Sequence, residues 1–150
     1  MTGNLEEFAA KLLLDMELPE GVANVAAEAL AQGDDSPTLR VLAVVSSPRK
    51  EEVLALLNRT FDEMGIRLLD PESAARFLAH RMARNISNNT VSPYEGTKAI
   101  WNLATRLRPL RLPELDPFIY AASEWEERTE DRALFERAIV DSAKELLSAS

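Results

Sequence analysis

Four Ser-Pro or Asp-Pro pairs constrain this chain more than any other feature, because each predicts the start of a helix. The Ser or Asp oxygen can accept a hydrogen bond from a backbone N–H of the first turn. Proline fits the first helical position, where its missing N–H costs nothing. The pairs are Ser36-Pro37, Ser47-Pro48, Asp70-Pro71 and Ser92-Pro93. Glu95 stands three residues after Ser92 and completes a capping box.

The other marks along the chain are helical too. Pro19 is expected to open a further helix, and Gly33 and Gly65 stand where helices should end. Apolar residues recur at helical spacing in eight segments: 5–16, 22–30, 39–43, 53–64, 75–86, 100–107, 115–122 and 135–146. Residues 40–45 could instead form a short buried strand, but the Ser-Pro pairs on both sides favour a helix. We predict an all-α fold of seven or eight amphipathic helices, either an orthogonal bundle or stacked helical hairpins.

Length and composition fit one domain over residues 1–150. The chain has no cysteine, which excludes disulfides, thiolate nucleophiles and thiolate metal sites. No stretch approaches the roughly 18 apolar residues of a membrane span. The first residues are acidic and no signal-peptide apolar region follows them, so we expect a cytoplasmic location and no membrane partner.

Charge is distributed in three blocks. Residues 1–75 hold 6 Lys/Arg and 14 Asp/Glu, residues 76–111 hold 7 Lys/Arg and one acid, and residues 112–150 hold 4 Lys/Arg and 10 acids. The net charge of −8 disfavours general affinity for nucleic acid or anionic lipid. A positive block therefore lies between two negative ones.

The positive block has two interpretations. The basic helices can pack beside acidic ones and be neutralised within the fold, or their side chains can form a patch for an acidic partner. Arginine dominates, and its planar fork suits carboxylate or phosphate. The candidate partner-binding residues are Arg76, Arg81, Arg84, Arg106, Arg108 and Arg111, together with Trp125.

Tryptophan is enriched at interfaces. Trp125 lies seven residues after Phe118, on the same helical face, and acidic residues flank it. We expect it half exposed at a helix end, as a partner contact or as a lid over the core. Trp101 adjoins an apolar stripe and is expected in the core.

Signals of catalysis are weak. His80, the sole histidine, has Arg76 and Arg84 at helical spacing, and an exposed histidine on a basic face is the favoured interpretation. The five glycines build no phosphate-binding loop, and neither Asp34-Asp35 nor the acids at 124–127 have the spacing of a calcium loop. The sequence therefore predicts no catalytic residue, no metal site and no cofactor.

Two stretches carry a resemblance. The run Gly33-Asp34-Asp35-Ser36-Pro37-Thr38-Leu39-Arg40-Val41-Leu42-Ala43, followed by Ile86 and Ser92-Pro93-Tyr94-Glu95-Gly96, resembles an uncharacterised family of small all-helical bacterial proteins. The likeness spans residues 20–150. The first stretch is also similar to the start of a HEAT-type helical pair. Neither resemblance implies an activity.

Three functional hypotheses follow. The first is a non-enzymatic protein-interaction module with a surface patch near residues 76–111 or around Trp125. A buried pocket with converging Arg and Asp/Glu side chains would contradict it. The second is a small-molecule binder or enzyme with a site between helices, for which the candidate groups are Arg40, Arg84, Asp116 and Glu124. The third, least favoured, is a nucleic-acid contact through the basic 76–111 segment.

Overall fold

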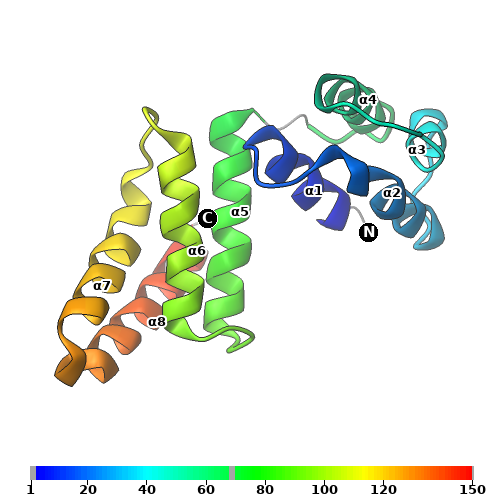
Figure 1. Cartoon of the computed structure of the whole chain (residues 1–150). Helices are drawn as coiled ribbons and strands as arrows, with labels where there is room; N and C mark the ends of the chain where they lie inside the picture. Colours follow the sequence, from blue (N-terminus) through cyan, green and yellow to red (C-terminus); the bar gives the residue numbers. More distant parts are fainter. Residues whose placement is uncertain (1–2, 68–69, 150) are drawn as a thin grey trace. The chain divides into compact units, whose positions relative to one another are not determined.

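The computed structural model describes residues 3–67 and 70–149. In these residues it contains eight α-helices, three short 3-10 turns and no strand, so the predicted all-α class is confirmed (Figure 1). The chain divides into two compact units, residues 1–74 and 75–150. The sequence predicted one domain over residues 1–150, and that stays a prediction. Each unit is described by itself.

The first unit contains α1 (Gly3–Leu13), η1 (Pro19–Gly21), α2 (Val22–Ala31), α3 (Pro37–Leu42) and α4 (Lys50–Glu63). α3 packs against α4 and α2, and α1 packs against α2 and α4. The predicted apolar stripes meet in one core. Its largest fully buried side chains are Leu5, Leu12, Leu39, Leu42, Leu57 and Phe61.

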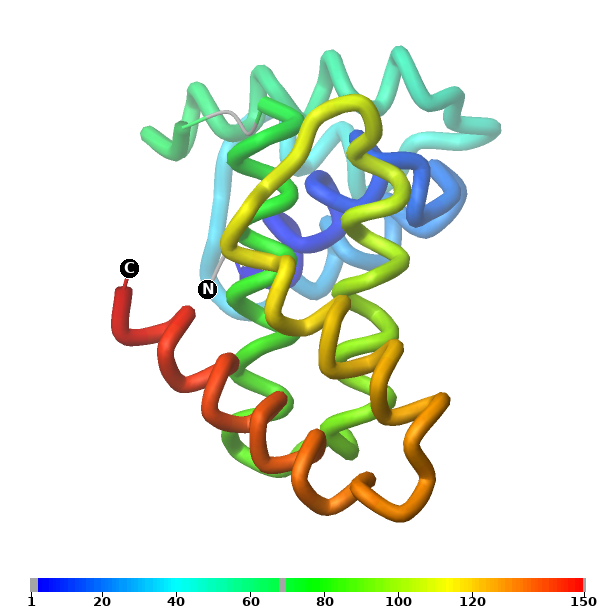
Figure 2. The backbone as a smooth tube through the Cα atoms, turned by 90° about the vertical axis from the view of Figure 1, so that its left-hand side faces the viewer, coloured from blue at the N-terminus to red at the C-terminus, as the bar shows by residue number. Residues whose placement is uncertain are grey.

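The second unit contains most of α5 (Pro71–Ser87), followed by α6 (Pro93–Leu107), η2 (Pro113–Leu115), α7 (Asp116–Glu127), η3 (Thr129–Asp131) and α8 (Arg132–Ser148). α5 and α6 lie side by side as an antiparallel pair, and α8 crosses them obliquely (Figure 2). α7 packs against both α6 and α8. The largest fully buried side chains are Leu78, Ile100, Leu103, Leu115, Phe118 and Ile139.

Three of the four predicted caps form. The Ser36 side chain accepts from the Leu39 N–H at 3.1 Å, Asp70 accepts from Ser73, and Ser92 accepts from Glu95. The hydrogen bond from the Ser73 backbone N–H also lowers the pKa of Asp70. Gly33 and Gly65 have φ of +106° and +72°, the left-handed conformation expected of glycine after a helix.

The fourth prediction, a helix capped by Ser47, is wrong. α4 begins at Lys50, its N-cap is Arg49, and the link after α3 runs from residue 43 to residue 49. Ser47 has φ +50°, whereas a capping residue needs an extended backbone to aim its side chain at the first turn. The Ser-Pro pair at this position therefore belongs to a loop.

Candidate functional site

The arginines of the predicted patch are divided between two elements of the second unit. Arg76, Arg81 and Arg84 lie on α5, whereas Arg106 lies in the last turn of α6 and the final two, Arg108 and Arg111, follow that helix. The second group surrounds the end of α6, where the helix dipole favours cations.

Several of these cations have a partner within the unit. The Arg76 Nε donates to Glu114 Oε2 at 2.8 Å, and this hydrogen bond holds the pKa of Glu114 below its ordinary value. Arg111 forms an ion pair with Asp116. The Arg81 guanidinium lies 5.6 Å from the centre of the Phe77 ring. Part of the positive block is therefore neutralised by acids of the same unit.

The charge of the whole second unit agrees with this. Residues 75–150 hold 11 Lys/Arg, 7 of them in residues 76–111 and 4 in residues 112–150. The same residues hold 11 Asp/Glu, so the second unit has no net charge. The net charge of −8 therefore comes from the first unit. Neutralisation nevertheless leaves local differences in charge on the surface.

A hollow of about 300 Å³ lies between the end of α6, the loop after it and the start of α7, and its lining holds more cations than acids. We call it the Trp101 hollow. Its lining comprises Trp101, Ala104, Thr105, Arg108, Pro109, Leu110, Arg111, Leu112, Asp116 and Ile119. Apolar side chains and an indole are thus combined with two arginines and one acid.

Trp101 contributes the indole of this surface from α6. It is half-buried rather than in the core as predicted, and it also lines a second, more open hollow of about 310 Å³ with Lys98, Asn102, Thr105 and Glu126. Lys98, Trp101, Thr105 and Arg108 are spaced three to four residues apart, which places them along one face of α6 and its end. The two hollows therefore adjoin along α6.

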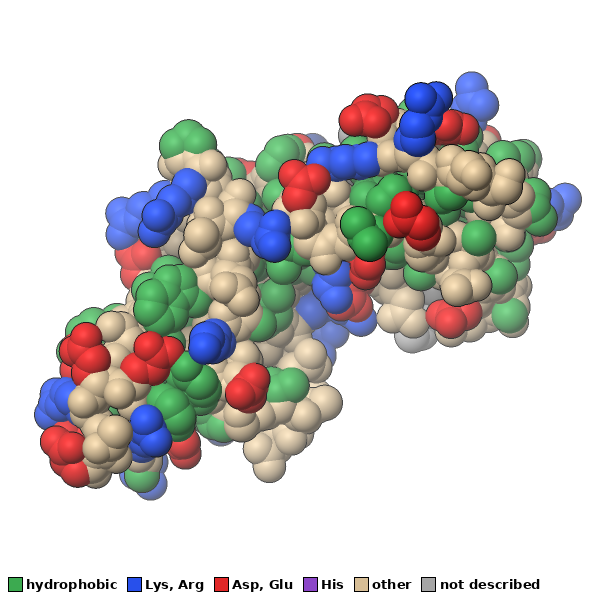
Figure 3. Space-filling view, in the orientation of Figure 1, with side chains coloured by type: hydrophobic (Ala, Val, Ile, Leu, Met, Phe, Trp, Pro, Cys, Tyr) green, Lys and Arg blue, Asp and Glu red, His purple; other side chains and the backbone are tan. Residues whose placement is uncertain are grey.

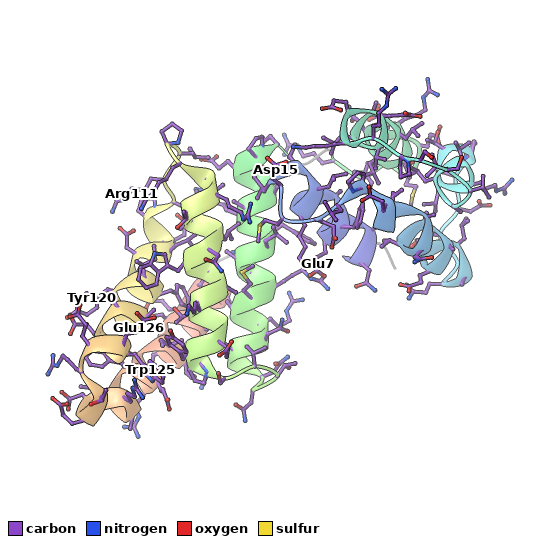
Figure 4. All side chains as sticks on the ribbon, in the orientation of Figure 1. Glu7, Asp15, Arg111, Tyr120, Trp125 and Glu126 are labelled. Atoms are coloured by element: carbon purple, nitrogen blue, oxygen red, sulfur yellow. The ribbon has the colours of Figure 1, made fainter. Side chains whose placement is uncertain are left out.

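The charged groups of the hollow are open to solvent. The side chains of Arg111 and Asp116 are 71% and 45% exposed. In Figure 3, hydrophobic side chains over α6 and α7 lie among Lys/Arg and Asp/Glu side chains. Arg111 lies near the loop between these helices, while Glu126 and Trp125 lie toward the other end of α7 (Figure 4). The hollow is a surface feature and not a buried polar pocket.

Trp125 belongs to a different cluster, which joins α6, α7 and α8. Its ring stacks on Tyr94 with centroids 3.9 Å apart, and the Arg132 guanidinium lies 3.8 Å from the ring centre. Its Nε1–H donates to Glu136 Oε2 at 3.0 Å, and Arg132 Nε donates to the Trp125 carbonyl oxygen. The Tyr94 hydroxyl donates to Glu126. Trp125 is half-buried, and these contacts hold three helices together.

The candidates for an enzymatic site are placed as follows. Arg40 belongs to the first unit and pairs with Asp35, while Glu124 lies 3.7 Å from Arg128, one turn along. Arg84 lies in the last turn of α5, and Asp116 lines the Trp101 hollow. His80 is half-buried rather than exposed as predicted, and the pKa of Glu114 is lowered chiefly by Arg76 and to a smaller extent by His80.

No group of three His, Asp or Glu side chains among residues 3–67 and 70–149 is placed to hold a metal ion. Within the same ranges, every helix is too short or too polar to cross a membrane.

The fold and the site thus define an all-helical chain that carries a tryptophan-lined, arginine-rich hollow on its surface. Comparison with protein-family models, curated protein sequences and solved structures found no match to the chain. The resemblance to small helical bacterial proteins stays a prediction.

Sequence reasoning identified Arg108 and Arg111 but missed the groups beside them. Leu110, Ile119 and Trp101 complete the hollow, and the indole was expected in the core. The available signal was the helical spacing of Trp101 with Lys98 and Arg108, since a tryptophan in register with cations lies at the edge of an apolar stripe.

Proposed function

We propose that the chain is a non-enzymatic protein-interaction module that binds an acidic segment of a partner protein in the Trp101 hollow. The single observation that carries this proposal is the half-buried indole of Trp101, which lines two adjoining hollows between cationic side chains. Partly buried tryptophans and arginines are the residue types that most often dominate binding energy at protein interfaces.

The local charge favours an acidic partner. Residues 104–112 contain Arg106, Arg108 and Arg111 and no acid. Of these three, Arg108 and Arg111 line the Trp101 hollow, and Asp116 pairs with Arg111. A carboxylate placed near Arg108 would meet a guanidinium whose fork can bind it through two hydrogen bonds. Such charge complementarity raises the association rate and selects against basic partners.

The apolar lining favours a peptide segment over a free anion. Ala104, Leu110 and Ile119 line the hollow beside the indole, so an apolar side chain next to an acid in the partner would find apolar surface to bury. Burial of apolar area contributes roughly 25 cal/mol per Å². A cytoplasmic location fits this proposal and remains part of it.

Selection from a phage-displayed library of random peptides on the intact chain tests the proposal. We expect enriched peptides with Asp or Glu beside an apolar residue. Their affinity should fall at least about 30-fold in Trp101→Ala, the size expected of an interface hot spot, and also fall in Arg108→Ala. Arg137→Ala, an exposed arginine on α8, is the matched control and should bind normally.

Two results would overturn the proposal. One is enrichment of basic or uncharged peptides, and the other is affinity that Trp101→Ala leaves unchanged. Binding of a single-stranded oligonucleotide that weakens steeply with salt and requires Arg108 would replace the acidic protein partner with nucleic acid.

A further inference from the structure

The first unit has an apolar groove of about 220 Å³ between α1 and α4. Its lining comprises Ala9, Leu13, Leu54, Ala55, Leu57, Asn58 and Phe61. Phe61 and Leu57 are fully buried and form the floor, Leu13 and Leu54 are half-buried, and Ala55 and Asn58 are exposed. Asn58 is the only polar side chain in this lining, so the groove differs chemically from the Trp101 hollow.

Acidic side chains follow the groove on both helices. On α4, Glu51 precedes Leu54 by three residues and Asn58 by seven, and Asp62 follows Asn58 by four. On α1, Glu6 precedes Ala9 by three residues and Leu13 by seven. Side chains at these separations lie on the same helix face. This spacing places carboxylates from both helices along the groove, together with two cations of α4. Lys50, four residues before Leu54, pairs with Asp15, and Arg59 follows Ala55 by four residues.

The charge of the surrounding unit also favours a basic partner for the groove. The first unit has 14 Asp/Glu against 6 Lys/Arg, and several of its cations are already matched by an acid. Lys11 pairs with Glu7, Lys50 with Asp15, and Arg40 with Asp35. Glu7 and Asp15 lie on and just after α1 (Figure 4). The unit consequently keeps a surplus of eight carboxylates, and a basic partner would be attracted to it.

We propose that this groove binds a basic amphipathic helix of a partner protein. The apolar face of that helix would enter the groove between α1 and α4, as in other helix-in-groove complexes, with anchors spaced three, four and seven residues apart. Lysine or arginine on the flanks of the same helix would face Glu6, Glu51 and Asp62. The proposal rests on the first unit alone and is independent of the Trp101 hollow.

The test uses the full chain and a fluorescent synthetic helix of about 18 residues, with leucines along one face and lysines on the flanks. We expect saturable binding whose affinity falls with added salt. A peptide of the same shape with glutamate in place of lysine should not bind. Methyl shifts in the NMR spectrum should change at Leu13, Leu54 and Leu57.

Variants separate the groove from general attraction between opposite charges. Ala55→Trp places a large side chain at an exposed position of the groove and should weaken binding at least about tenfold, or 1.4 kcal/mol. Ala27→Trp, at an exposed position of α2, is the matched control and should bind normally. Glu51→Gln together with Asp62→Asn should lower both the affinity and its salt dependence.

Three outcomes would overturn the proposal. Binding could survive Ala55→Trp, the glutamate peptide could bind equally well, or the chain could form dimers that Ala55→Trp abolishes, which would make a second copy the occupant. Trp101→Ala should leave lysine-peptide binding unchanged, and Ala55→Trp should leave acidic-peptide binding unchanged. The two surfaces can therefore fail separately.

Discussion

Gly96 shows how a single residue sets the distance between two helices. A Cβ built on Gly96 of α6 would lie 2.3 Å from Ile86 Cγ1 and 3.1 Å from Val91 Cγ2. Ile86 is buried in α5, so its side chain has little room to move away. Glycine is required here by the close approach of α5 and α6, although its helical backbone would accept any residue.

The Gly96→Ala variant is therefore expected to be less stable by about 1–3 kcal/mol, the usual cost of overpacking a core. Helix propensity alone predicts the opposite sign, a gain of up to about 1 kcal/mol. Chemical denaturation followed by circular dichroism measures the difference. Asn102→Ala, exposed on the same helix, should change stability by less than about 0.5 kcal/mol. An equally or more stable Gly96→Ala would show that the contact is loose.

At the scale of elements, the sequence predicted the helices well and one boundary badly. Ser36 and Ser92 have extended backbones, with ψ of 157° and 152°, and both cap. Ser47 carries the same Ser-Pro signal but has a left-handed φ. Capping depends on the backbone conformation of the capping residue. The loop after α3 sets that conformation, and the dipeptide alone does not reveal it.

This contrast gives a paired test. Ser36→Ala should destabilise the protein by about 1 kcal/mol, because the Leu39 N–H loses its acceptor at a buried position. Ser47→Ala should change stability by less than about 0.5 kcal/mol. Thermal unfolding of both variants beside the wild type measures this. Equal losses from the two substitutions would contradict the assignment of the caps.

α3 has a second cap that no local pattern predicts, because it comes from α4. The Thr38 N–H and hydroxyl donate to the two Glu63 oxygens at 2.9 and 2.6 Å. Both hydrogen bonds lower the pKa of Glu63, and the one from the Thr38 hydroxyl has the larger effect. A carboxyl with a lowered pKa stabilises the fold above its unfolded pKa of about 4.3, and this stability is lost as pH falls through the folded pKa.

Glu63→Gln should therefore reduce stability at neutral pH and flatten its decline between about pH 5 and the folded pKa. The Thr38 amide proton resonance of the wild type should shift as Glu63 titrates. Glu28→Gln, exposed on α2, should keep the wild-type decline. If the stability of Glu63→Gln declines with falling pH as in the wild type, the Glu63 cap contributes nothing to the stability of the fold.

At the scale of the whole molecule, the sequence left open whether the positive block of residues 76–111 is neutralised within the fold. The positive block is balanced inside the second unit by acids such as Glu114 and Asp116, which follow it in the chain. Sequence predicted the block but not its partners, because these depend on how η2 and the start of α7 fold back onto it. What remains locally positive is the loop at Arg108 beside Trp101, because Arg111 is paired with Asp116.

The most direct test of the central claim is ionic quenching of Trp101 fluorescence in a Trp125→Phe background, where Trp101 is the only indole. At constant ionic strength, the ratio of iodide quenching to caesium quenching should be higher for Trp101 than for free N-acetyltryptophanamide, although the whole chain has a charge of −8. Replacing Arg108 and Arg111 by alanine should lower that ratio toward the free value. A ratio equal to or below the free value, or an indole that neither ion reaches, would contradict an exposed, locally positive Trp101 hollow.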